Sequence, residues 1–128
     1  MNKNNLKKKV EVFKMEEKIT SKFRYQLDCR YDSRASFYGK AEVEIFSDDS
    51  QVLRSYSTYV ACITPDGKAH VRGQYSQTTT RHIREFLKQA NFKADSIHQI
   101  LKDYGDDMTK EGTEDFSWRI FLLDRGLH

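Results

Sequence analysis

The clearest pattern in the chain is an alternation of apolar and polar side chains. In "KFRYQLDCRY", residues 22–31, every second residue is apolar and the residues between them are charged or polar. A period of two residues predicts a strand with one face in the core and the other in water. The predicted core face consists of Phe23, Tyr25, Leu27, Cys29 and Tyr31.

Two more segments predict strands, each preceded by a polar turn. After "DSRAS", the segment "FYGKAEVEIF" at 37–46 places Ala41, Val43 and Ile45 on one side of a second strand. After "SDDS", the segment "QVLRSYSTYVACIT" at 51–64 is rich in β-branched and aromatic residues and predicts one long third strand. Before the first predicted strand, the segment "VEVFKMEEKI" at 10–19 fits either a short strand or a helix start.

The tripeptide "PDG" at 65–67 predicts a hairpin between the third strand and residues 68–76. Proline first and glycine third suit a type I turn followed by a left-handed residue. If Thr64 pairs with Lys68, the pairs that follow are Ile63 with Ala69, Cys62 with His70, Ala61 with Val71 and Val60 with Arg72. This register gives an apolar face of Tyr59, Ala61, Ile63, Ala69 and Val71, and an opposite face that carries Cys62, His70 and Arg72.

The segment "YSQTTTRHIREFLKQ" at 75–89 changes to a helical period. We expect Thr78 or Thr79 to cap the helix, because a threonine hydroxyl accepts a hydrogen bond from an amide of the first turn. Arg81 and Glu85 lie one turn apart and are expected to form an ion pair. The predicted buried stripe, at the spacing i, i+3, i+4, i+7, is Ile83, Phe86, Leu87 and Ala90.

A second helix is predicted from Asp95 or Ser96 to Tyr104, with Gly105 ending it. Residues 116–124, "FSWRIFLLD", alternate again and predict a last strand that returns to the sheet. The expected fold class is therefore α+β: an antiparallel meander sheet of about four to five strands with two helices packed on one face. We expect a flexible basic N-terminus at 1–9 and a single α+β domain at 10–128.

Composition limits the function classes. The chain of 128 residues is 38% hydrophobic and 12% aromatic, which suits one folded domain. Its net charge of +3 favours an anionic partner without requiring one. The two cysteines lack the Cys-x-x-Cys spacing, and no apolar run reaches the roughly 20 residues that cross a bilayer. We therefore expect an intracellular protein that does not enter the membrane, with reduced thiols.

Metal and nucleophile chemistry have one candidate pair, Cys62 and His70, which face each other in the predicted hairpin. His82 could add a third ligand, but a structural zinc site needs four. As a nucleophile, Cys62 has no glycine-rich elbow beside it. We therefore expect no metal, no cofactor and no catalytic residue, and keep a small zinc-binding protein or hydrolase as an alternative.

Nucleic-acid binding is a second alternative. The strand positions Lys22, Arg24 and Arg30, together with Lys68 and Arg72, predict a basic sheet surface on which tyrosines could stack bases. The same residues fit an ordinary solvated face, and acidic residues are nearly as numerous as basic ones.

The segment 55–89 resembles an uncharacterised domain family of small bacteriophage and plasmid proteins, mostly from Gram-positive hosts. The resemblance is carried by Ser55, Tyr56, Thr58, Val60 and Ala61, and by Tyr75, Ser76, Thr79, Thr80, Arg81, His82, Phe86 and Leu87. It implies a mobile-element protein in the cytoplasm of a bacterial host. By analogy with anti-CRISPR inhibitors, such a protein would occlude a host defence enzyme, with a type II RNA-guided nuclease as the leading target.

We therefore expect a non-enzymatic binding module whose partner is a host protein, with nucleic acid as the alternative partner. Tyrosine and arginine side chains supply much of the contact energy at protein interfaces. The expected partner-binding residues are Arg72, Tyr75, Arg81, His82 and Arg84. The sequence leaves the oligomeric state open.

Overall fold

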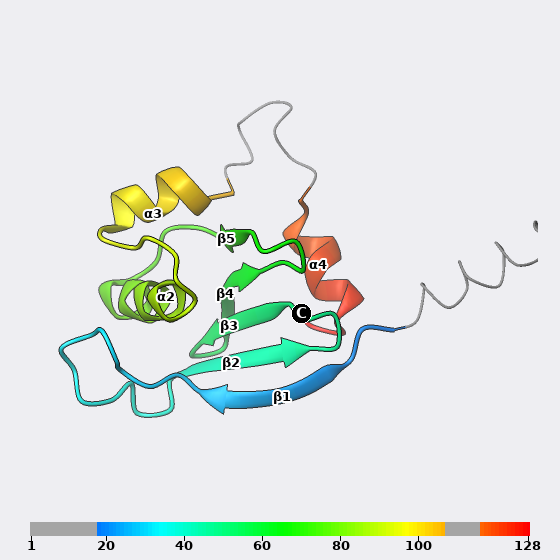
Figure 1. Cartoon of the computed structure of the whole chain (residues 1–128), viewed down its shortest axis with the longest axis horizontal. Helices are drawn as coiled ribbons and strands as arrows, with labels where there is room; N and C mark the ends of the chain where they lie inside the picture. Colours follow the sequence, from blue (N-terminus) through cyan, green and yellow to red (C-terminus); the bar gives the residue numbers. More distant parts are fainter. Residues whose placement is uncertain (1–17, 107–115) are drawn as a thin grey trace, which may run out of the picture.

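The computed structural model describes residues 18–106 and 116–128, in which five strands form one open antiparallel sheet. Each strand pairs with the next along the chain, so the sheet is a meander in the order β1-β2-β3-β4-β5 (Figure 1). The expected α+β fold class is confirmed, whereas the expected flexible terminus at 1–9 lies outside the described residues. The elements are β1 (Ser21–Gln26), β2 (Ala41–Phe46), β3 (Gln51–Ser55), β4 (Thr58–Ile63), β5 (Ala69–Val71), α2 (Gln77–Gln89), α3 (Ile97–Tyr104) and α4 (Trp118–Asp124).

The predicted core face of the first strand is wrong for its aromatic residues. All six residues of β1 are exposed, including Phe23 at 54%, and Tyr31 beyond the strand is 59% exposed. β1 is one of the two edge strands, and the helix-covered core begins only at Leu27, in the segment that follows it. An alternating sequence predicts a strand but does not reveal which strands of the sheet the helices cover.

The predicted long third strand is in fact two strands. β3 ends at Ser55 and β4 begins at Thr58, so Tyr56 and Ser57 make a two-residue hairpin loop. Tyr56 has a φ of +54°, which a tyrosine adopts infrequently, and its amide donates a hydrogen bond to the Lys40 carbonyl at 2.7 Å. The sequence lacks the glycine or asparagine that normally marks such a loop.

The hairpin at "PDG" has the predicted register. Ile63 pairs with Ala69, Cys62 with His70 and Ala61 with Val71, while the Arg72 amide donates to the Val60 carbonyl at 2.9 Å. Gly67, with a φ of +79°, occupies the left-handed position that the turn requires.

Helix α2 begins at an earlier cap than predicted. The Oγ of Ser76, not of Thr78 or Thr79, accepts a hydrogen bond from the Thr79 amide at 3.2 Å. Thr79 instead turns its hydroxyl inward to Ser55, with the two oxygens 2.9 Å apart. The predicted buried residues Ile83, Phe86 and Leu87 do pack in the core with sheet residues such as Val43 and Leu53.

Helix α3 starts and stops as predicted, with Ser96 as its cap and Gly105 after its last residue. Its residue Ile100 is fully buried in the same core cluster as the apolar face of α2. Two helices therefore cover one face of the sheet, as expected from the sequence.

The C-terminal segment is a helix rather than the predicted strand. In α4 the residues Trp118, Phe121 and Leu122 also satisfy the i, i+3, i+4 spacing, and the Ser117 hydroxyl caps the helix by accepting from the Ile120 amide. Phe121 and Leu122 pack against Phe46, Val52 and Cys62, so α4 covers the second face of the sheet.

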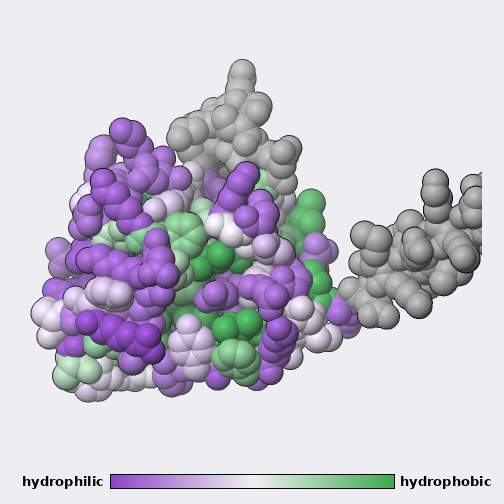
Figure 2. Space-filling view, viewed as in Figure 1, coloured by the Kyte–Doolittle hydropathy of each residue, from purple (hydrophilic) through white to green (hydrophobic). Residues whose placement is uncertain are grey.

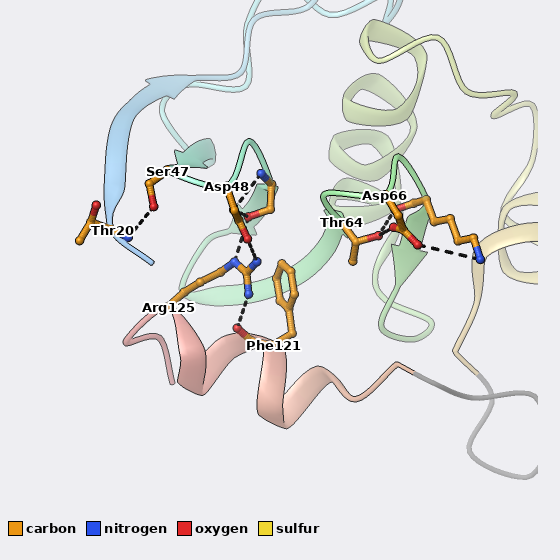
Figure 3. Close-up of polar contacts among 9 residues, drawn as sticks. Thr20, Ser47, Asp48, Thr64, Asp66, Phe121 and Arg125 are labelled. Carbon is orange, nitrogen blue, oxygen red and sulfur yellow. Dashed lines mark hydrogen bonds and ion pairs between the residues drawn. The ribbon is translucent and has the colours of Figure 1, made fainter. Parts of the chain in front are cut away.

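Arg125 fastens α4 to the β2–β3 turn (Figure 3). Its buried guanidinium lies over the Phe121 ring at 3.7 Å and pairs with Asp48. Its Nε donates to the Ser50 hydroxyl at 2.9 Å and its Nη1 to the Phe121 carbonyl at 2.9 Å. Within the described residues, no helix has the length and apolar content to cross a membrane.

Candidate functional site

The face of α2 turned away from the sheet carries a line of basic side chains. Arg81, Arg84 and Lys88 lie at i, i+3 and i+7, which places them on one stripe, named here the α2 ridge. Figure 2 shows that hydrophilic side chains gather over α2 and α3, on the left of the molecule. The ridge separates two surface hollows.

The first hollow has a volume of about 260 Å³ and lies between α2 and the segment that follows β1. It contains both signs of charge. Its lining consists of the α2 ridge with Tyr31, Asp32, Ser33 and Glu85.

Glu85 joins α2 to the segment with Tyr31 and Asp32, which forms one wall of this hollow. The carboxylate, in a residue only 1% exposed, accepts hydrogen bonds from the backbone amides of Tyr31 at 2.9 Å and Asp32 at 2.8 Å. Its second oxygen accepts from Gln89 Nε2 at 2.7 Å. Charge-assisted bonds of this kind are about twice as strong as neutral ones.

The predicted Arg81–Glu85 ion pair is wrong, because Glu85 is committed to these amides. Arg81 Nη1 instead pairs with Asp32 Oδ1 at 3.0 Å, and the Asp32 carboxylate is 4% exposed. Asp32 Oδ1 also accepts from the Arg34 amide at 2.9 Å. Arg81 is thereby held in place at one end of the ridge.

The second hollow has a volume of about 400 Å³ and shares Arg81 and Arg84 with the first hollow. It brings together three of the five residues expected to bind a partner: Tyr75, Arg81 and Arg84. The remaining lining residues are Gln74, Gln77, Thr80 and Ile97. Tyr75 is half-buried against the core, and burial raises the pKa of its phenol above the ordinary value.

Arg84 has an unused hydrogen-bond donor. Its Nε atom is buried and has no hydrogen-bond partner within residues 18–106 and 116–128. Native structures leave few such groups without a partner.

His82 and Arg72 lie away from these hollows. His82 is 1% exposed and points to the interior, where its Nδ1 lies 2.7 Å from Ser55 Oγ and its ring packs edge-on against Phe37. Burial lowers the pKa of its imidazole below the ordinary value. Arg72 is exposed near α4, with its guanidinium 5.9 Å from the Trp118 ring centre. The structure therefore brings neither residue to the α2 ridge.

Cys62 and His70 oppose each other across the hairpin as predicted, but they differ in environment. Cys62 is fully buried, and that burial raises the pKa of its thiol so far that a thiolate does not form at neutral pH. His70 Nδ1 lies 3.0 Å from Asp106 Oδ1, and its ring stacks on Phe116 at 3.8 Å. Across the described part of the chain, no group of three or more His, Cys, Asp or Glu residues is arranged to hold a metal ion.

Sequence reasoning missed Asp32, Glu85 and Ile97 at these hollows. The segment with Asp32 reads as a polar turn, and Glu85 reads as a solvated helix residue. One signal was present in the sequence. Glu85 directly precedes the buried Phe86 and Leu87, so the helical period of 3.6 residues is compatible with a buried side chain at position 85.

The chain belongs to a family of unknown function (DUF8033), whose model matches residues 25–103. The matched region runs from the last part of β1 almost to the end of α3, and it includes both hollows and the segment 55–89. No curated protein and no solved structure matches the chain.

Proposed function

We propose that the protein is a non-enzymatic binding module that docks on a partner protein through the α2 ridge and its two hollows. One observation carries the proposal. Tyr75, Arg81 and Arg84, which the sequence pattern singled out as contact residues, line one hollow. The helix that presents the two arginines is anchored by a buried apolar face, and Tyr75 lies just before that helix.

The rigidity of this surface supports a binding role. Arg81 is fixed by Asp32, and the segment with Tyr31 and Asp32 is fixed by Glu85. A surface ordered before contact loses less conformational entropy when a partner docks.

The nucleophile candidate from the sequence, Cys62, and a Ser55–His82 pair that the structure reveals are both closed to solvent. Ser55 and His82 form a hydrogen-bonded pair, but both are buried, at 2% and 1% exposure. The Cys62 thiol is fully buried and uncharged. These positions support packing roles for the three residues, and they favour binding over catalysis.

The proposed partner is a host protein in the bacterial cytoplasm. In the phage and plasmid setting implied by the resemblance, that host protein is a defence enzyme, with a type II RNA-guided nuclease first among the targets. The mixed charge of the first hollow favours a protein surface, because protein surfaces present both signs of charge.

Nucleic acid remains a second candidate because the three ridge cations lie on one helical stripe. Its signature would be a steep fall of affinity with salt. The buried carboxylates of Asp32 and Glu85 beside the ridge oppose a run of phosphates, which places this candidate second.

Affinity capture with mass spectrometry in a Gram-positive host that carries a type II CRISPR nuclease tests the proposal. The informative variant is Arg84→Glu, since Arg81→Glu would set a carboxylate against buried Asp32 and disturb the fold. Arg119→Glu, at an exposed position of α4, is the matched control. Thermal melting of the variants checks that each is folded.

We expect the wild-type chain and the Arg119→Glu control to capture the same host protein, and Arg84→Glu to lose about tenfold or more of it. Capture of no specific protein, or equal capture by Arg84→Glu, would refute docking through the ridge. A random oligonucleotide that is shifted at low salt while no protein is captured would favour the second candidate.

A further inference from the structure

The two hollows beside the α2 ridge differ in chemistry. The first contains two carboxylates, Asp32 and Glu85, whereas the seven residues lining the second include no acidic residue. The second is lined by hydrogen-bond donors: two guanidinium groups, two side-chain amides and the Tyr75 hydroxyl, whereas the Thr80 hydroxyl already donates to the Ser76 carbonyl at 2.9 Å. Such a lining attracts an oxyanion and disfavours a cation.

The unused donor of Arg84 adds a directional element. A guanidinium presents its N–H groups in a planar fork that matches the two oxygens of a carboxylate. Arg84 lines both hollows, and its buried Nε has no partner within the described residues. By contrast, the Nη1 of Arg81 already pairs with the Asp32 carboxylate. Since the Nε of Arg84 is closed to solvent, a ligand carboxylate would meet the two terminal Nη groups of the fork.

The position on the helix acts in the same direction. Gln77 is the first residue of the thirteen-residue α2 and Thr80 belongs to its first turn, so the hollow opens beside the helix N-terminus. The first turn contains no acidic residue to offset the positive end of the helix dipole.

We infer that the second hollow receives a glutamate or aspartate side chain from an acidic segment of the partner protein, with Arg84 as the bidentate anchor and Arg81 as the second cation. This inference rests on the proposed function and specifies the chemistry of the partner. Tyr75 and Ile97 provide an apolar wall for the methylene groups of that side chain. A single side chain enters this hollow without meeting the carboxylates of the neighbouring hollow, whereas a continuous phosphate backbone along the ridge would pass both hollows, which favours a protein carboxylate over nucleic acid.

An NMR titration tests the site without knowledge of the partner. The probe is a short peptide with two central glutamates and blocked ends, and its match has glutamines in their place. We expect the glutamate peptide to move the Arg84 side-chain Nε–H resonance and the backbone amides of Tyr75, Gln77 and Thr80. The glutamine peptide should bind at least about tenfold more weakly, since charge-assisted bonds are lost.

Variants assign the effect to the fork of Arg84. Arg84→Gln should weaken the glutamate peptide by about tenfold or more, and Arg84→Lys should recover only part of the affinity because a lysine lacks the planar fork. Arg119→Gln should bind like the wild type. Equal binding of the two peptides, or undiminished binding by Arg84→Gln, would overturn the inference.

Two further arms separate the sources of the oxyanion and the two proposals. If inorganic phosphate and an oligonucleotide move the Arg84 resonance while the glutamate peptide does not, the carboxylate assignment is overturned in favour of phosphate. If the ridge captures a host protein equally well with Arg84→Gln, the inference fails and the binding function stands. Glutamate binding at Arg84 without any captured protein upholds the site and refutes the function.

Discussion

The Glu85 contact gives the sharpest test of how the recognition surface is built. Replacing Glu85 with alanine removes three hydrogen bonds from one buried carboxylate: two from the amides of Tyr31 and Asp32 and one from Gln89. Hydrogen bonds to charged groups contribute about 1.5–3 kcal/mol each, so their simple sum is about 4.5–9 kcal/mol.

The expected loss is smaller than that sum because water can replace part of the contact. Tyr31 is 59% exposed, so its amide gains access to solvent once the carboxylate is gone. We therefore expect Glu85→Ala to lower the free energy of unfolding by about 3 kcal/mol. At this chain length that corresponds to a fall in melting temperature of about 10 °C.

Urea unfolding followed by circular dichroism measures the loss, and amide hydrogen exchange locates it. Exchange should accelerate most at Tyr31 and Asp32. The control is Glu42→Ala, which breaks a partly exposed pair with Arg54 and should cost less than about 1 kcal/mol. A loss below 1 kcal/mol for Glu85→Ala, or unchanged exchange at the two amides, would show that the carboxylate does not hold the segment to α2.

Three further outcomes follow from buried groups. Burial lowers the pKa of His82 below its ordinary value of 6.5, so the unfolded chain binds a proton at a higher pH than the folded chain does. The free energy of unfolding should therefore fall as the pH drops below about 6.5. In urea titrations from pH 7 to 5, His82→Gln should show a shallower fall than the wild type. An equal slope in both proteins would contradict this assignment. Cys62 is fully buried, whereas Cys29 is only partly buried. A thiol reagent should therefore modify Cys29 alone in the folded protein and both cysteines in denaturant. Equally fast modification of both thiols in the folded protein would refute the burial of Cys62. Arg125→Ala leaves Asp48 without its partner and should cost about 3 kcal/mol in the same urea assay, and a cost under 1 kcal/mol would mean that α4 is held by its apolar face alone.

The sequence was most informative where one local signal determined the backbone. The turn "PDG" determined the register of β4 and β5, because proline and glycine restrict the turn to few conformations. The helical spacing of Ile83, Phe86 and Leu87 likewise predicted the buried face of α2. Each of these inferences needed only residues adjacent in the chain.

The errors arose where distant residues decided the outcome or where the local pattern was ambiguous. The loop at Tyr56 is imposed by pairing between strands rather than by a turn residue, and the seven-residue α4 has a sequence that fits two periods equally well. His82 was taken for a surface residue because its partner Ser55 lies 27 positions away. The link between Glu85 and Tyr31 spans 54 positions, which no local pattern encodes.

The outermost strand has a consequence for solubility. Among the described residues β1 pairs with β2 alone, so its other edge offers free backbone groups to a second molecule, and Phe23 and Tyr25 add exposed aromatic surface to it. Lys22 and Arg24 interrupt that surface, and charged residues at sheet edges oppose the stacking of one copy on another. Neutralising these two cations would leave the chain folded and turn its edge into a template for aggregation, visible as turbidity rather than as a lower melting temperature.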